Sequence, residues 1–227
     1  MDQIADIRDE GFAIIPSVFS SREISDAINS LAQSHLPRSR AGIRHAMRDS
    51  SVAMLANSPC LLELSCKVLG GTAIPFRTTL FDKSPTANWL VVWHQDTALP
   101  LRERRERPGW GPWSVKEGVS YAHAPARALE QVVALRLHLD DSLPENGPLR
   151  VLPGSHRSGV LDDEGIRELV SASTPMDCFV EKGGILAMRP LIVHSSSKSQ
   201  SDIQRRVLHI EYARTVAIDE GLELAVA

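Results

Sequence analysis

From Thr72 onward the chain consists of short apolar runs separated by turn residues, and this pattern constrains the fold more than any other feature. Runs of β-branched and aliphatic residues bounded by Gly, Pro, Asn, Asp and Ser are typical of strands. Residues 131–139 show the pattern best, because aliphatic residues there alternate with Arg136 and His138. Strands are predicted at residues 11–16, 75–81, 89–94, 131–139, 149–152, 184–188, 191–194 and 206–212. Many short strands of this kind predict a β-barrel or a double sheet.

The part of the chain before residue 72 carries helix signals instead. Ser20, with Glu23 three residues later, forms the pattern of a capping box, which predicts a helix over residues 21–34. Apolar spacing predicts a second helical stretch over residues 50–69 and a shorter helix over residues 164–171. We therefore predict a mainly β fold with N-terminal helices.

Residues 101–124 fit neither pattern. Interleaved arginines and glutamates over residues 102–107 are followed by a Gly- and Pro-rich stretch that contains Trp110 and Trp113. The segment is predicted to be a long loop, and long loops inside a domain often act as lids or binding segments. The two tryptophans could close over a ligand or simply pack within the loop.

The chain is expected to form one domain over residues 1–227, because no internal repeat, linker or low-complexity tract interrupts it. This length is enough for one substantial core. The mainly helical part would occupy residues 1–71 and the strand-rich core residues 72–215.

Composition and charge exclude several classes of partner. The formal net charge of −3 provides no overall attraction to nucleic acid or to anionic membranes. Cys60, Cys66 and Cys178 lack the C-x-x-C spacing of zinc or redox sites and are predicted to be free thiols. No apolar run approaches the roughly 20 residues of a membrane helix, and the start Met1-Asp2-Gln3-Ile4 shows no signal-sequence pattern. We expect a cytoplasmic monomer or homodimer that acts on a small-molecule substrate, without nucleic acid or membrane as partner.

A candidate metal site begins at the motif Trp93-His94-Gln95-Asp96. Side chains two apart on a strand project from the same face, so His94 and Asp96 could bind one ion. His194, which closes the apolar run 191–193, is the best candidate for a third ligand. Two histidines and one carboxylate are the ligand set of non-haem Fe(II) oxygenases. A lone H-x-D pair is common without a metal, and a histidine at a strand end is usually a core residue.

Candidate binding residues lie on the predicted strands near this motif. Arg205 and Arg206 open the last strand, and a guanidinium can hold a carboxylate by two parallel hydrogen bonds. Strand alternation cannot choose between these two arginines, and both could equally be solvated. Arg77 and Thr79 share one strand face. His138 is a rival third metal ligand, but its position beside Arg136 favours a polar face instead.

Several short motifs occur together and in a fixed order. They are Phe81-Asp82-Lys83-Ser84, Trp93-His94-Gln95-Asp96, Asn146-Gly147-Pro148-Leu149-Arg150-Val151, Pro153-Gly154-Ser155-His156, and His194 followed by Arg205. With these motifs, the chain from residue 81 to residue 212 resembles the phytanoyl-CoA dioxygenase family of Fe(II)/2-oxoglutarate-dependent oxygenases. The resemblance implies a double-stranded β-helix, the jelly-roll core of cupin-like proteins.

The resemblance also implies roles for individual residues. His94, Asp96 and His194 would bind Fe(II), and Arg205, helped by Ser196, would bind 2-oxoglutarate. Apart from the resemblance, strand position predicts further contacts to the co-substrate for Arg77 and Thr79 and contacts to the substrate for Arg136 and His138. Loop position predicts substrate contacts for Trp110 and Trp113.

The activity implied is hydroxylation of an unactivated C–H bond of a small organic substrate, with O2 consumed and succinate and CO2 released. Family members that halogenate have a small residue in place of the carboxylate ligand, so Asp96 favours hydroxylation. One alternative is a cupin-like metalloprotein, an isomerase or dioxygenase that does not use 2-oxoglutarate. Another is a binding module without catalysis. The family's substrates are too varied for the resemblance to name one.

Overall fold

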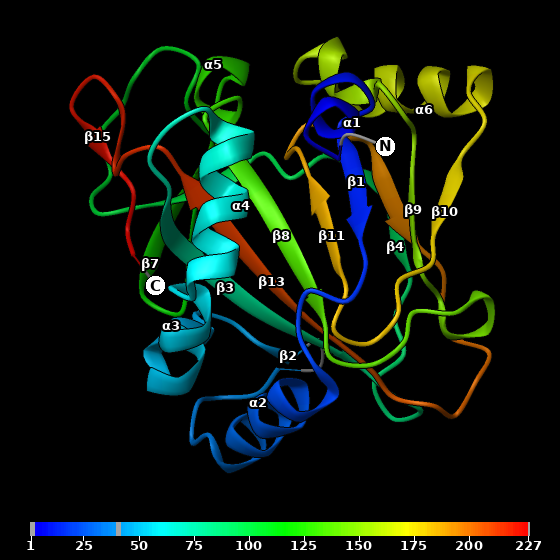
Figure 1. Ribbon diagram of the computed structural model, residues 1–227. Helices are drawn as coiled ribbons and strands as arrows, with labels where there is room; N and C mark the ends of the chain where they lie inside the picture. The colour runs from blue at the N-terminus through cyan, green and yellow to red at the C-terminus, as the bar shows by residue number, and fades with distance from the viewer. Residues whose placement is uncertain (1–2, 40–41, 227) are drawn as a thin grey trace.

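Two antiparallel β-sheets form the centre of the protein, as the computed structural model shows for residues 3–39 and 42–226 (Figure 1). Met1 and Asp2, which entered the signal-sequence expectation, and the last residue of the predicted domain lie outside the described residues. The larger sheet has the strand order β1 (Phe12–Ile15), β11 (Ile185–Met188), β8 (Val132–His138), β13 (Arg205–Ala213), β3 (Ile74–Lys83) and β2 (Gly42–Ile43). The smaller sheet has the order β10 (Met176–Cys178), β9 (Leu149–Val151), β12 (His194–Ser196) and β4 (Val91–His94).

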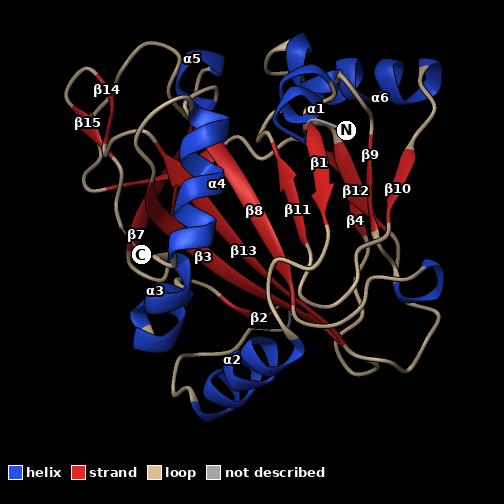
Figure 2. Cartoon of the chain, viewed as in Figure 1, coloured by secondary structure: helices blue, strands red, loops and turns tan. Residues whose placement is uncertain are grey.

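Smaller sheets and helices surround this centre (Figure 2). The remaining strands are β5 (Ala98–Leu101), β7 (Val119–His123) and β6 (Trp113–Lys116) in one sheet, and β14 (Ala217–Asp219) with β15 (Leu222–Glu223) in another. The helices are α1 (Gln3–Asp9), α2 (Ser21–Gln33), α3 (Ser50–Ala56), α4 (Pro59–Leu69), α5 (Ala126–Leu129) and α6 (Asp163–Ala172). Short 3-10 turns occur at Ala46–Arg48, Pro144–Asn146 and Ser155–Ser158. The predicted capping box at the start of α2 is present, with Ser20 and Glu23 each bonding the other's backbone.

The two faces of the larger sheet have different environments. On the outer face, which α4 crosses in Figure 1, Leu135 and Leu137 of β8 share a core cluster with Leu61 of α4 and Ile24 of α2. Ala134 of β8 belongs to a second cluster, which contains residues of both sheets. All seven residues of β8 are buried, as expected for a strand covered on both faces.

Polar side chains collect on the inner face of the larger sheet. The register places Arg77 opposite Glu211, Thr79 opposite His209, and Lys83 opposite Arg205. On the other side of β13, His209 is opposite Arg136 of β8. Because side chains alternate across a strand, these residues share one face. These side chains form a polar row within an otherwise apolar interior, and we call this row the polar lane.

The helical stretch predicted as one unit over residues 50–69 is wrong in one respect, because it forms two helices. Pro59 occupies the first turn of α4, where its missing N–H costs nothing, and a helix rarely continues through the residue before a proline. The axes of α3 and α4 differ by 48°. In the described part of the chain no single helix meets the length and hydropathy of a membrane span; this bent pair does so only when its two helices are counted together.

The prediction of a structureless loop over residues 101–124 is also wrong. Its second half forms the β6–β7 hairpin, with Lys116 opposite Val119 and a two-residue turn between them. Both turn residues, Glu117 and Gly118, have positive φ, as type I′ hairpin turns require.

The strand predicted over residues 191–194 begins only at His194. The three aliphatic residues before it are buried in three different core clusters, Leu191 in one, Ile192 in another and Val193 in a third. Their hydrophobicity reflects a turn through the core rather than a pleated strand.

Candidate functional site

Three side chains from two distant parts of the sequence, His94 and Asp96 in one and His194 in the other, meet at one point beside β4 and β12. The Nε2 atoms of His94 and His194 each lie 3.6 Å from a different carboxylate oxygen of Asp96. The two imidazole rings are 4.2 Å apart, centre to centre. One ligand atom from each residue falls within 4.8 Å of the others, so the set can bind one metal ion.

Backbone hydrogen bonds orient both imidazoles in the same way. Nδ1 of His94 donates to the carbonyl of Val92 and Nδ1 of His194 to that of Ile192, each at 2.9 Å. A carbonyl only accepts, so Nδ1 carries the proton and Nε2 presents its lone pair towards Asp96. Hydrogen bonds of this kind usually fix the tautomer of metal-binding histidines.

The triad is closed on one side and open on the other. Side-chain exposure is 4% for His194, 26% for Asp96 and 37% for His94. Burial lowers the pKa of His194 to about 4, so this imidazole is neutral at pH 7. Burial acts to raise the pKa of Asp96, but the nearby imidazoles outweigh it and hold that pKa well below its usual range. A charged carboxylate beside a neutral imidazole is the protonation state that metal binding needs.

The predicted strand geometry holds for only one half of the H-x-D pair. His94 is the last residue of β4, whereas Asp96 lies beyond the strand end. The backbone N–H of Asp96 donates to the carbonyl of Pro190 at 2.9 Å instead of to a ladder partner. The carboxylate is therefore positioned by the turn that precedes His194.

Gln95, between the two ligands, anchors the same region. Its amide nitrogen donates to the carbonyls of Leu191 and Gly159, at 2.7 and 2.8 Å, and its amide oxygen accepts from the N–H of Leu161. Gln95 contacts no ligand side chain, but it holds the strand end against the turn that carries His194.

A pocket of about 120 Å³ extends from the triad into the polar lane and is lined by Lys83, Arg136, Ser196 and Arg205. We call it the Arg205 pocket. Its three cations are 2 to 6% exposed and bond only to neutral acceptors among the described residues. Arg205 donates to the Asn146 carbonyl at 3.1 Å, Arg136 to His209 Nδ1 at 3.0 Å, and Lys83 to Ser196 Oγ and the Ser197 carbonyl at 3.0 and 2.5 Å.

The chemistry of this pocket fits a dicarboxylate co-substrate. Burial, reinforced by mutual repulsion, lowers the pKa of Arg205 to about 10 and that of Lys83 to about 8. Nε of Arg136 is buried without a hydrogen-bond partner among the described residues, as are both ring nitrogens of His138, which does not itself line the pocket. Buried charges and donors without counter-charges are costly, and an anion in the pocket would offset that cost.

The structure separates the two arginines that strand alternation could not. Arg206 forms a two-pronged pair with Asp140, at 2.7 and 2.8 Å, outside the pocket. Arg205 points into the pocket. Sequence reasoning assigned no role to Lys83, although Arg77, Thr79, Phe81 and Lys83 alternate along β3 and that period could have revealed it.

A second pocket, of about 160 Å³, reaches Asp96 and is lined by Arg44, Arg77, Thr79, Phe81 and His209, among others. We call it the Arg44 pocket. Arg77 is already neutralised there by a two-pronged ion pair with buried Glu211. The structure places Arg77 and Thr79 in this pocket and not in the Arg205 pocket, so their predicted contact with the co-substrate stays a prediction.

The two tryptophans of segment 101–124 lie elsewhere. Trp110 is buried in a core cluster, with its indole N–H donating to Asp219 at 2.8 Å, and Trp113 packs against the same cluster. Neither lines the Arg205 pocket or the Arg44 pocket. Of the two predicted roles for these tryptophans, packing rather than closing over a ligand matches their environment.

Sequence comparison identifies a matching family model and one similar protein of named activity. The family model described as Phytanoyl-CoA dioxygenase (PhyH) matches residues 7–207. The L-proline trans-4-hydroxylase of Streptomyces griseoviridis is 29% identical over 192 residues, which cover 73% of this chain and 64% of that protein. The chain thus spans less than two thirds of that relative's length.

Structure comparison finds the same architecture in several solved proteins. AviO1 from Streptomyces viridochromogenes Tue57 matches with a TM-score of 0.66 and 21% identity, over 93% of each chain. The epimerase SnoN from nogalamycin biosynthesis, in complex with Fe3+, alpha ketoglutarate and nogalamycin RO, matches with a TM-score of 0.72 and 18% identity, over 94% of this chain and 83% of SnoN. EctD from S. alaskensis, with 2-oxoglutarate and 5-hydroxyectoine, matches with a TM-score of 0.69 and 20% identity, over 93% and 74%.

At these identities the structural matches show the fold, and they confirm the predicted double-stranded β-helix core. The family model covers most of the chain, including the helical part that precedes the motifs. The chain belongs to the phytanoyl-CoA dioxygenase family, whose members use iron and 2-oxoglutarate.

Proposed function

We propose that this protein is an Fe(II)- and 2-oxoglutarate-dependent oxygenase that hydroxylates an unactivated C–H bond of a small organic substrate. The observation that carries the proposal is the convergence of His94, Asp96 and His194, with both Nε2 lone pairs free, beside a pocket of unmatched buried cations.

The residues divide the work between metal and co-substrate. The triad would hold Fe(II), and Arg205, with Ser196 and Lys83, would hold the far carboxylate of 2-oxoglutarate. Bound iron and 2-oxoglutarate supply O2 activation, in which one oxygen atom enters the substrate as hydroxyl while 2-oxoglutarate becomes succinate and CO2. Apolar side chains in the same lining exclude water, which strengthens the attraction between the guanidinium and the carboxylate.

Anaerobic titration of the Fe(II)-loaded protein with 2-oxoglutarate tests the proposal. We expect a saturable visible charge-transfer band from the chelate, followed by succinate formation when O2 and substrate are added. Absence of the band would favour the cupin-like alternative without 2-oxoglutarate. A band without succinate from any substrate would favour the binding-module alternative.

Amino acids come first in the substrate screen. The relative at 29% identity is named an L-proline trans-4-hydroxylase, so L-proline is the first compound to test. Asp96 occupies the carboxylate position of the ligand set, which favours hydroxylation over halogenation.

A further inference from the structure

Arg44, which lines the Arg44 pocket, and Lys116, which lies near it, have no acidic partner among the described residues. Arg44 lines the pocket and is exposed, and Lys116 of β6 is half-buried. Neither forms an ion pair within the described ranges 3–39 and 42–226. Their charges are therefore available to a ligand.

The β6–β7 hairpin brings Lys116 next to the pocket. The ring of His45, the residue after Arg44, lies 3.4 Å from the carbonyl of Lys116 through its Nε2 atom. The ammonium of Lys116 lies 4.8 Å from the centre of the Tyr121 ring, and the guanidinium of Arg77 lies 5.7 Å from the same centre. Lys116 and the pocket-lining Arg77 thus lie over the same Tyr121 ring, which places Lys116 beside the pocket, although it is not part of the pocket lining.

The charges around Arg44 and Lys116 leave a positive excess. Arg77 is neutralised by Glu211, and Asp96 is a predicted ligand of the metal. Glu117 is exposed at the hairpin turn and forms no ion pair in the described structure. Burial first, then repulsion by Arg77 and Arg44, lowers the pKa of Lys116. An anion bound there would relieve that repulsion.

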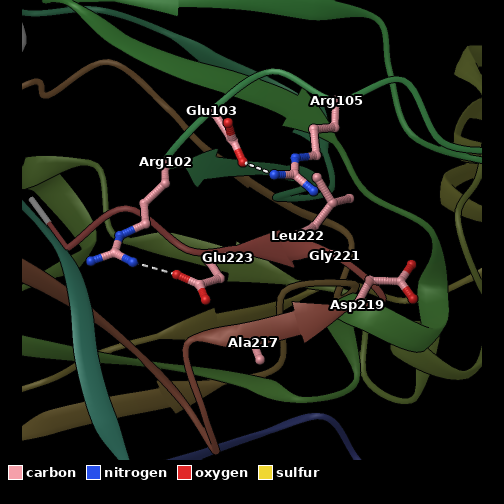
Figure 3. A pocket seen from close by; sticks show the side chains of 8 residues that line it. All are labelled: Arg102, Glu103, Arg105, Ala217, Asp219, Gly221, Leu222 and Glu223. Atoms are coloured by element: carbon pink, nitrogen blue, oxygen red, sulfur yellow. Dashed lines mark hydrogen bonds and ion pairs between the residues drawn. The ribbon is translucent and has the colours of Figure 1, made fainter.

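Another pocket lined by arginines differs from the Arg44 pocket, because its arginines already have acidic partners. The pocket in Figure 3, which we call the Glu223 pocket, is larger, at about 540 Å³. There Arg102 points to Glu223 and Arg105 to Glu103, so each guanidinium is already paired (Figure 3). Size alone would favour that pocket, but its matched charges give an anion no advantage.

We propose that the substrate is a small organic acid whose carboxylate is held by Arg44 and Lys116, so that the rest of the molecule extends through the Arg44 pocket towards Asp96. The inference rests on the proposed function, since it names the substrate class of the same site. The pocket's volume of about 160 Å³ suits a molecule of amino-acid size, because drug-sized ligands occupy ~300 Å³ or more.

Matched pairs of acid and amide test the proposal. L-Proline and L-prolinamide, together with a panel of other amino acids and their amides, are titrated by calorimetry into anaerobic protein loaded with Fe(II) and 2-oxoglutarate. We expect at least one acid to bind about tenfold or more tightly than its amide. Arg44→Gln and Lys116→Gln should each raise the Kd of that acid by about tenfold and leave the Kd of its amide unchanged.

The control variant is Arg105→Gln in the Glu223 pocket, which removes a positive charge that is already paired with Glu103 and does not line the Arg44 pocket, and it should leave acid binding unchanged. The chelate band with 2-oxoglutarate should persist in all three variants, which shows that they fold and separates this test from that of the proposed function. A panel in which no acid binds more tightly than its amide would overturn the proposal. So would acid binding that is insensitive to both Arg44→Gln and Lys116→Gln.

Discussion

The Arg205 pocket and the Arg44 pocket both reach Asp96, yet they balance charge in different ways. In the Arg205 pocket three buried cations bond to neutral groups, so none of them has an ion-pair partner among the described residues. In the Arg44 pocket the partly buried guanidinium of Arg77 already has a carboxylate partner, whereas Arg44, and Lys116 beside the pocket, have none among the described residues. Glu211 supplies the counter-charge inside the Arg44 pocket, whereas the cations of the Arg205 pocket would gain one only from a bound ligand.

The largest expected effect is at the residue that the two pockets share. Asp96→Ala removes the only carboxylate of the triad, so Fe(II) binding and 2-oxoglutarate turnover should fall below detection. The measurement is succinate formation together with the chelate band. Full turnover in this variant would mean that another residue supplies the carboxylate ligand.

Breaking the internal pair of the Arg44 pocket should reduce stability. Glu211→Gln keeps the shape of the side chain but leaves Arg77 without its counter-charge in a site where Glu211 is 1% exposed. Breaking a buried pair in this way costs about 3–5 kcal/mol, measured as the free energy of unfolding in denaturant. A loss below ~1 kcal/mol would show that solvent or a neighbouring group screens Arg77.

Removing a cation from the Arg205 pocket should instead weaken the binding of 2-oxoglutarate. Arg205→Ala removes the cation predicted to hold the far carboxylate, so the KM for 2-oxoglutarate should rise about 100-fold. Arg206→Ala is the matched control, because Arg206 pairs with Asp140 outside the pocket and should leave this KM unchanged. Equal effects of the two substitutions would contradict the assignment of Arg205.

Metal affinity should depend on pH through the more exposed histidine. Burial acts to lower the pKa of His94, but its interaction with Asp96 outweighs burial and raises that pKa. A raised pKa keeps the proton on His94 to higher pH, so protons compete with metal over more of the neutral range. Below that pKa, affinity should fall about tenfold per pH unit. Titration with Mn(II) at pH ~6 and pH ~8 measures it, and equal affinities would show that His94 does not bind the metal.

The smallest effect is expected in the Glu223 pocket. Glu223→Gln breaks an exposed pair with Arg102, whose side chain is 70% exposed, so the free energy of unfolding should change by less than ~1 kcal/mol. Compared with Glu211→Gln, this variant measures how much burial contributes to an arginine–carboxylate pair in the same protein.

Local patterns predicted the features that depend on local physics. The alternation in residues 131–139 and the capping box at Ser20 were visible because they depend on neighbours in sequence. The choice between Arg205 and Arg206 was not, since it depends on Asp140, more than sixty residues away in sequence. The β6–β7 hairpin was missed because its strands are only four and five residues long, although Glu117-Gly118 resembles the Asp-Gly turn signal.

The metal site also has a part that depends on local sequence and a part that depends on distant residues. The ligand types could be read from the sequence, but Asp96 lies beyond the strand and is positioned by Pro190, which no periodicity reveals. Lys83 was overlooked because a lysine at a strand end is usually solvated. Alternation along β3 puts it on the same face as Arg77 and Thr79, and the pairing of β3 with β13 places it opposite Arg205 inside the fold.

The strand that carries His94 lies at the border of the smaller sheet, paired on one side only, with β12. An ion shared by His94 and His194 would therefore also act as a cross-link between a border strand and its interior neighbour. Metal removal should free the amides of residues 91–94 to exchange with deuterated solvent, while those of β12 stay protected by β9. Metal binding and the local opening of β4 would therefore be thermodynamically linked, so that each changes the other.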